Sequence, residues 1–241
     1  MSSSNQGGHF FLGVFLAVGL ALCGYFVGQT MYNAKVAVNT AEAKGLAERR
    51  VKADRANWDI IHTVTGSKKE EIPSLYTLAE THQKTIINLL KEHGFEDNEI
   101  DIGVLDYRYQ EFRDEDQKLV DQTHQLIGTI SVETQKVEKV NQARTTVSKL
   151  IAQGIDIENR VPRYRFTKLN DIKPDMLREA TKNARIAASE FAENAGAKVG
   201  SIRSARQGNF FISDAGEEYG DTRKIEKDVR VVTTIDFYLT E

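Results

Sequence analysis

The chain has 241 residues, with 32 Lys and Arg against 35 Asp and Glu, and a formal net charge of −3. This balance argues against a dedicated nucleic-acid-binding protein, which normally presents a strongly basic face. The one cysteine, Cys23, leaves the rest of the chain without a disulfide or a thiol nucleophile. Proline is scarce and no low-complexity linker is present, so we expect a compact folded part of one large or two small domains.

The first 34 residues contain no Asp, Glu, Lys or Arg, and residues 10–27 form an unbroken apolar run. A helix through this run would be about 27 Å long at roughly 1.5 Å per residue. That length is close to the bilayer hydrocarbon thickness of about 30 Å. We therefore predict a polar tail over residues 1–9, a transmembrane anchor over 10–30 and a folded domain over 35–241.

A cleaved signal peptide and a lipoprotein signal are the alternatives to an anchor. A signal peptide would have a basic start, a shorter apolar core and a small-x-small site just after it. Here the nearest such triplet, Ala41-Glu-Ala43, lies far beyond the core. Residues 1–9, which precede the core, contain no Lys or Arg. Lipidation needs small residues before the cysteine, but Leu22 precedes Cys23. The sequence favours an uncleaved anchor that crosses a lipid bilayer, and leaves the alternatives open.

A stripe of small residues runs along one face of the predicted anchor. Its members are Gly13, Ala17, Ala21, Gly24 and Gly28. Spacings of three and four residues place them on one helix face. Such a stripe lets transmembrane backbones approach closely, as in the small-xxx-small motif. We predict helix–helix packing here; the alternative is that Gly and Ala are simply common in membrane helices.

Charge does not settle the membrane topology. Lys35, Lys44, Arg49 and Arg50 follow the anchor and no basic residue precedes it. The positive-inside rule would then place the C-terminal part in the cytoplasm, but the rule weakens when a long folded domain follows.

Alternating and helical patterns divide the rest of the chain into strands and helices. We predict strands over 51–64, 100–112, around 126–132, over 157–167, 198–205 and 228–239. Helices are predicted from Pro73 to Gly94, over 135–153 and from Pro174 to Gly196. The third helix should present a flat face of Leu177, Ala180, Ala184, Ala187, Ala188 and Phe191. These elements indicate an α+β fold of two small subdomains, with antiparallel or mixed sheets and helices on one face.

Catalytic chemistry is hard to assemble from this sequence. The five histidines have no partner ligand at i, i+4 spacing, and no nucleophile elbow, phosphate-binding loop or dinucleotide fingerprint occurs. The acidic turn over 96–101 lacks the glycine and closing glutamate of a calcium loop. His82 lies on the apolar stripe of its helix and is interpreted as a buried core histidine. We expect no enzyme, no catalytic residues, no cofactor and no metal.

Two further segments could bind a partner. The connection over 207–214 carries Phe210, Phe211 and Ile212, and apolar side chains in a long loop either tuck beneath it or meet a partner. We predict a subunit contact there. Arg163 and Arg165 alternate with aromatic residues, which indicates a core strand with a charged outer face rather than a lipid or nucleic-acid patch.

Several separated motifs resemble the SIMPL-domain family of bacterial envelope proteins. They are Lys44-Gly-Leu-Ala-Glu-Arg49, Val51-Lys-Ala-Asp54 with Trp58, Gly200-Ser-Ile-Arg-Ser-Ala205 with Gln207-Gly208 and Phe210, and the final run from Val229 to Leu239. The resemblance implies an α+β fold of two subdomains and assembly into large, ring-like homo-oligomers. It also implies a cytoplasmic N-terminus at the inner membrane, a periplasmic domain and a loose link to oxidative-stress defence. It supplies no catalytic residues.

Two functions compete on this basis. The first is a non-enzymatic, membrane-anchored envelope protein whose main partner is itself. The second is an extracytoplasmic domain that binds a small molecule or senses stress. Fold alone cannot decide between them.

Overall fold

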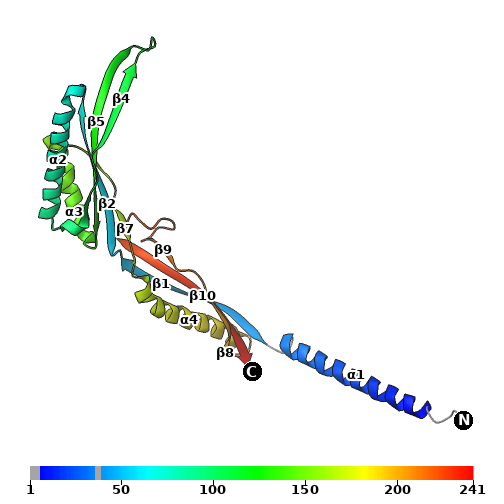
Figure 1. The fold of residues 1–241 in the computed structure, drawn as a ribbon. Helices are drawn as coiled ribbons and strands as arrows, with labels where there is room; N and C mark the ends of the chain where they lie inside the picture. Colours follow the sequence, from blue (N-terminus) through cyan, green and yellow to red (C-terminus); the bar gives the residue numbers. More distant parts are fainter. Residues whose placement is uncertain (1–5, 36–38, 241) are drawn as a thin grey trace. The chain divides into compact units, whose positions relative to one another are not determined.

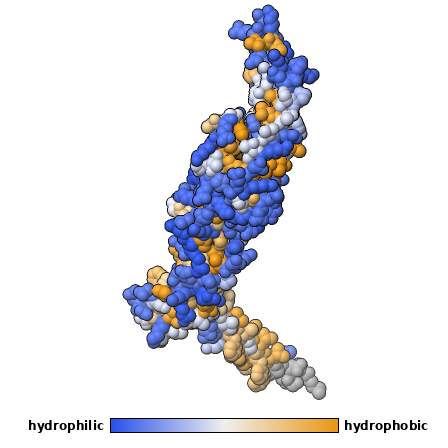
Figure 2. Space-filling model, turned by 90° about the vertical axis from the view of Figure 1, so that its left-hand side faces the viewer, coloured by the Kyte–Doolittle hydropathy of each residue, from blue (hydrophilic) through white to orange (hydrophobic). Residues whose placement is uncertain are grey.

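The structure is a computed structural model that describes residues 6–35 and 39–240 (Figure 1). Residues 1–5 of the predicted polar tail lie outside the described residues. The N-terminal helix α1 extends over Gln6–Lys35, and within it His9–Ala34 is long and apolar enough to cross a membrane. Figure 2 shows α1 as a continuous apolar surface. Its central residues are exposed, with Phe15 at 73%.

The chain forms two compact units. Unit 1 takes the residues up to 47, residues 175–209 and those from 231 on; unit 2 takes residues 48–174 and 210–230. One sheet has the order β1 (Thr40–Lys52), β10 (Glu226–Thr240), β8 (Lys198–Gln207), and β9 (Phe211–Asp214) also pairs with β10. The pairings of β10 with β8 and with β9 are antiparallel.

The core of unit 1 lies between this sheet and helix α4 (Leu169–Asn194). It consists of Ala43, Ala184, Ala188, Ile235 and Phe237. The predicted small-residue face explains how close the helix comes: a Cβ on Gly45 of β1 would collide with the carbonyl oxygen of Ala180. Phe191 was wrongly predicted on this face, because its side chain is 64% exposed. The helix also begins five residues before Pro174 rather than at it.

Unit 2 contains the second sheet, in the order β3 (Ile100–Ile102), β5 (Leu119–Thr134), β2 (Arg55–Gly66), β6 (Asp156–Asn159). In addition, β4 (Asp106–Arg113) pairs with β5, and β7 (Arg163–Arg165) pairs with β2. All of these pairings are antiparallel. Helices α2 (Ile72–Glu92) and α3 (Val137–Ser148) cover one face, as Figure 1 shows. Single 3₁₀ turns lie at Lys69–Glu71, Asp97–Glu99 and Lys149–Gln153.

The helix boundaries in unit 2 follow the predicted signals. Pro73 stands in the first turn of α2, where a missing N–H is harmless. Gly94 and Gly154 have φ of +86° after the two helical segments, a conformation that glycine adopts without strain. Trp58 and Ile60 of β2 are fully buried beneath these helices, as the alternation predicted. The predicted α+β class, with antiparallel sheets and helices on one face, is thus confirmed.

The strand predicted over residues 51–64 is in fact two strands. β1 ends at Lys52 and pairs with β10, whereas β2 starts at Arg55 and pairs with β5. At the break, the Asp54 carboxylate accepts hydrogen bonds from Thr167 N at 2.6 Å and Thr167 Oγ1 at 2.7 Å. A partner 113 residues away holds this corner, so local alternation could not reveal it.

Two other predicted strands are divided as well. The strand over 100–112 is split into β3 and β4, and that over 157–167 into β6 and β7. The connection over 207–214 contains β9, which pairs with β10 from Lys227 to Arg230. Phe211 and Ile212 therefore belong to a strand, whereas Phe210 lies in the connection just before it.

Candidate functional site

The small-residue stripe lies on α1, as predicted from its spacing. A Cβ at Gly13, Gly24 or Gly28 would meet no atom within 4 Å in this chain. The glycine backbone is therefore accessible to a second helix. Packing of Gly13, Ala17, Ala21, Gly24 and Gly28 against another helix stays a prediction.

Phe210 immediately precedes β9, Phe211 and Ile212 begin it, and the three side chains do not share one environment. The Lys173 ammonium stands 5.7 Å from the centre of the half-buried Phe210 ring. Ile212 is half-buried and pairs with Val229 of β10. Phe211 points away, with 66% of its side chain exposed. Of the three residues, Phe211 offers the largest free apolar surface, and its role in a subunit contact stays a prediction.

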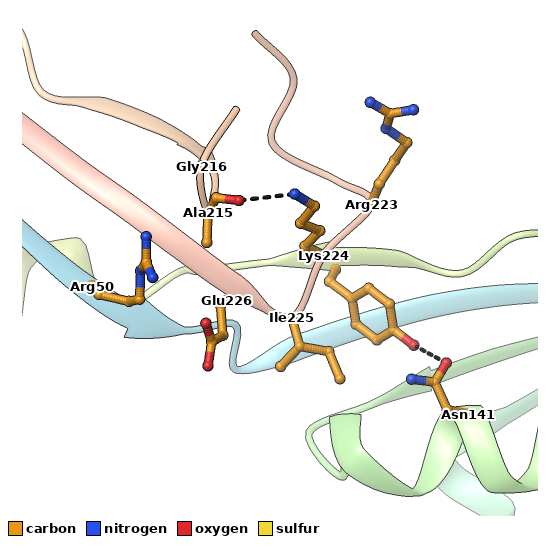
Figure 3. Close-up of a pocket in the computed structure, with 9 residues that line it drawn as sticks. Arg50, Asn141, Ala215, Gly216, Arg223, Lys224, Ile225 and Glu226 are labelled. Carbon is orange, nitrogen blue, oxygen red and sulfur yellow. Dashed lines mark hydrogen bonds between the residues drawn. The ribbon is translucent and has the colours of Figure 1, made fainter. Parts of the chain in front are cut away.

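A shallow polar pocket of about 540 Å³ lies in unit 2 (Figure 3). Its lining residues are Arg50, Asn141, Tyr164, Ala215, Gly216, Arg223, Lys224, Ile225 and Glu226. The cations already have carboxylate partners within the chain: Arg50 bonds both oxygens of Asp228 at 2.8 and 2.9 Å, and Arg223 and Lys224 share Glu217. Tyr164 donates to Asn141 Oδ1 at 3.0 Å. The pocket therefore has polar walls whose side chains are largely engaged with one another.

A fully buried ion pair, which sequence reasoning missed, lies next to the loop over residues 215–226 that lines this pocket. Lys227 Nζ donates to Asp214 Oδ1 at 2.5 Å and to the carbonyl oxygen of Asp221 at 2.7 Å. Asp214 also accepts from the backbone N–H groups of Arg223 and Lys224. Burial raises the pKa of Asp214, but these hydrogen bonds outweigh it and hold the pKa below the ordinary 3.8. The pair fixes the loop that forms one wall of the pocket.

A second buried polar group, His62, has no such partner. Its side chain, on β2 beside Gly128 of β5, is fully buried, and neither ring nitrogen has a hydrogen-bond partner among the described residues. Burial, and to a smaller extent the charge of His82, lower its pKa from 6.5 to about 4. His62 is therefore neutral at pH 7. The prediction that His82 is a buried core histidine is only partly met, because its side chain is half-buried rather than enclosed.

The most exposed apolar region of unit 2 is the hairpin of β4 and β5. Every residue of β4 is exposed, and large apolar side chains are open to solvent on the hairpin and beside it: Val104 (80%), Val120 (68%), Leu119, Tyr107, Tyr109 and Phe112. Apolar patches are visible on the hairpin at the top of Figure 2. Large exposed apolar patches mark interaction sites in soluble proteins. The sequence predicted a strand here but not that all of β4 would be exposed.

Two tyrosines hold the base of this hairpin. The rings of Tyr107 and Tyr109 stack on His124, with centroids 6.0 and 4.9 Å away. Tyr107 Oη lies 2.6 Å from His124 Nδ1. Tyr109 also donates to Glu111 at 2.7 Å, and Arg113 bonds the same carboxylate. These contacts order one face of β4 while its outer edge stays open.

Within the described ranges, no group of three or more His, Cys, Asp or Glu side chains is placed to hold a metal ion. The polar side chains that the structure brings together are the Asp214–Lys227 ion pair and the stack of Tyr107 and Tyr109 on His124.

The folded part of the chain matches the sequence model of a known family. The sequence model of the SIMPL family, described as a protein of unknown function (DUF541), matches residues 42–233. The match covers well over half of the chain, so the chain belongs to the SIMPL family, as its motifs predicted. No curated protein matches the chain.

Proposed function

We propose that this chain is a non-enzymatic, membrane-anchored envelope protein whose folded part self-assembles into a large, ring-like homo-oligomer. The observation that carries the proposal is the uncovered apolar surface of the β4–β5 hairpin, which a folded monomer would ordinarily bury or replace with polar residues. The ring shape and a role in oxidative-stress defence rest on the family resemblance alone. The bilayer and other copies of the chain are the proposed partners.

In this proposal α1 crosses the bacterial inner membrane, with the N-terminus in the cytoplasm and the SIMPL domain in the periplasm. The length and apolar surface of His9–Ala34 support the crossing. Trypsin added to spheroplasts tests the orientation, because the domain carries many exposed Lys and Arg side chains. Digestion of the domain without lysis is expected, and protection until lysis would contradict the orientation.

Mass measurement tests the assembly most directly. The full-length protein in mild detergent is compared with a shortened chain that begins at Asn33. A discrete large particle in both is expected, because the main proposed contacts lie in the folded part outside α1, and the stripe on α1 would only add cohesion to the full-length particle. Monomers in both would overturn the proposal.

The stripe on α1 is tested separately. Gly24→Leu combined with Gly28→Leu places two large side chains where helix backbones would meet. If the stripe contributes, the particle should lose cohesion in detergent, whereas Leu16→Ala with Leu20→Ala, on other positions of the helix, should leave it intact. An unchanged particle in the glycine variant would show that the stripe has no role.

A small-molecule-binding domain is the second candidate, and the pocket of about 540 Å³ favours it. Its volume lies within the usual range of ligand sites, but its polar walls differ from their mostly apolar lining. Native mass spectrometry of the freshly purified protein is the test. A retained small molecule that is lost in Lys224→Ala would support this candidate, and a bare protein mass would count against it.

A further inference from the structure

We infer that the open edge of β4 pairs antiparallel with the β4 of a second copy, about a two-fold axis at Gln110. This inference rests on the proposed self-assembly and names its contact. β4 is hydrogen-bonded to β5 on one side, and within the described residues no strand pairs with its other side. An eight-residue edge leaves a row of backbone N–H and C=O groups available to another strand.

The composition of β4 protects its edge only in part. Proteins commonly guard such edges with charged side chains, lysine above all, or with proline, bulges or very short strands. The segment Asp106-Tyr-Arg-Tyr-Gln-Glu-Phe-Arg113 contains two acidic residues and two arginines, but it has no Lys or Pro, and three of its eight residues are aromatic. Aromatic side chains favour strand pairing through cross-strand contacts. The irregularity between Phe112 and Arg113 lies at the far end and leaves most of the strand regular.

Side-chain geometry restricts the registers that a two-fold pair can use. Residues directly opposite each other in an antiparallel pair point to the same face, so a symmetric pair must be centred on one residue. Centring on Arg108 would oppose two arginines, and centring on Glu111 would oppose two glutamates. Like charges directly opposite each other are destabilising. Centring on Tyr107 or Phe112, near the strand ends, would align only three of the eight residues. Of the central positions, Tyr109 and Gln110 remain as centres that oppose no like charges within the strand.

The Gln110-centred register gives the better complementarity of the two. It places Arg108 opposite Phe112 and Tyr107 opposite Arg113, and each of these pairings occurs twice. Guanidinium groups beside aromatic rings are favourable contacts. Tyr109 lies opposite Glu111, the carboxylate to which it already donates within its own strand. The Tyr109-centred register instead places Asp106 opposite Phe112 and Arg108 opposite Gln110, so no arginine of the strand stands opposite an aromatic ring.

Disulfide trapping in the full-length chain tests this contact. In a Cys23→Ser background, Gln110→Cys puts one thiol on the two-fold axis, where opposite Cα atoms would be about 4.5–5.5 Å apart. That separation is within the range of disulfides, about 4.4–6.8 Å. We expect most of the protein to become a covalent dimer under mild oxidation in detergent. The control is Thr123→Cys, which lies opposite Gln110 on β5 and not on the outer edge of β4, and it should stay monomeric on the gel.

The register has its own test. Arg108→Cys and Phe112→Cys, each in the Cys23→Ser background, should cross-link when mixed and not when oxidised alone. If neither the mixture of Arg108→Cys and Phe112→Cys nor Gln110→Cys alone cross-links, while the protein remains a large particle by mass, the β4 contact is overturned and the proposed assembly stands. A protein that is monomeric by mass would overturn both. Gln110→Lys, which opposes two ammonium groups at the axis, should at least halve the particle mass, whereas Thr123→Lys should not.

Discussion

Two polar side chains of unit 2 are equally buried and yet are accommodated in opposite ways. Lys227 and His62 both have fully buried side chains. Lys227 is enclosed by Asp214 and a backbone carbonyl oxygen. His62 is neutral, and its ring nitrogens have no hydrogen-bond partner among the described residues. The comparison shows that burial alone does not decide protonation: hydrogen bonds hold the pKa of buried Asp214 below its ordinary value, whereas burial without such bonds lowers the pKa of His62 until the ring is neutral.

Removing the partner of Lys227 should produce the largest loss of stability. Asp214→Leu leaves a buried ammonium without a carboxylate, and breaking a buried pair in this way costs about 3–5 kcal/mol. Lys227→Met added to Asp214→Leu removes both charges and should restore much of the stability. Urea unfolding followed by the fluorescence of Trp58, the one tryptophan, measures both variants. Equal losses in the single and double variants would show that the charge of Lys227 is not the cause.

His62 should make the protein acid-sensitive. Its folded-state pKa of about 4 lies below the ordinary 6.5, so the unfolded state binds the proton more readily. Stability from this group is therefore present above pH 6.5 and is lost as the pH falls from 6.5 towards 4, by about 3 kcal/mol at 1.36 kcal/mol per pKa unit.

The measurement is the free energy of unfolding of His62→Leu minus that of the parent, at pH 7.5 and at pH 4. The difference should move by about 3 kcal/mol in favour of His62→Leu on acidification. His93→Gln, at the end of α2, serves as the matched control and should keep the acid loss. Parallel pH profiles for His62→Leu and the parent would contradict the pKa assigned to His62.

Much of the fold could be predicted because its signals are local. Alternation marked β2 and β10, and Pro73, Gly94 and Gly154 marked helix ends where their backbone preferences act within a few residues. The apolar run fixed α1 by length alone. The break at Asp54 escaped prediction because its partner, Thr167, is distant in sequence.

The polar features of the site were harder to predict for the same reason. Lys227 lies on the buried face of β10, in phase with Val229 and Val231, but alternation treats a lysine as an exposed residue. Only its pairing with Asp214 explains its burial, and that pairing depends on how residues 214–227 fold. The exposure of β4 was missed because strand-forming residues predict a strand and not what covers it.

A moderate loss is expected at Gly128, which lies opposite His62 in the sheet. A Cβ there would collide with Nε2 of His62 and approach Leu105 Cδ2 to 2.9 Å. Overpacking of this kind costs about 1–3 kcal/mol. Gly128→Ala should therefore destabilise the protein, and His62→Ala should relieve most of the clash. The double-mutant cycle, again by urea unfolding, should show a cost well below the sum of the two single changes. Additive costs would mean that the His62 ring does not lie against Gly128.

The smallest effect is expected at the exposed counterpart of the buried pair, Arg50 and Asp228. Arg50 makes two hydrogen bonds to that carboxylate, and these bonds are the main cause of the lowered pKa of Asp228. The geometry is bidentate, but the Arg50 side chain is 58% exposed, so water and salt screen the attraction. Arg50→Gln should shift the thermal midpoint less than any variant above, and 1 M NaCl should remove that shift. A loss of stability as large as that caused by Asp214→Leu would mean that solvent exposure does not weaken the Arg50–Asp228 pair relative to the buried one. The contrast between buried and exposed charges would then fail for this protein.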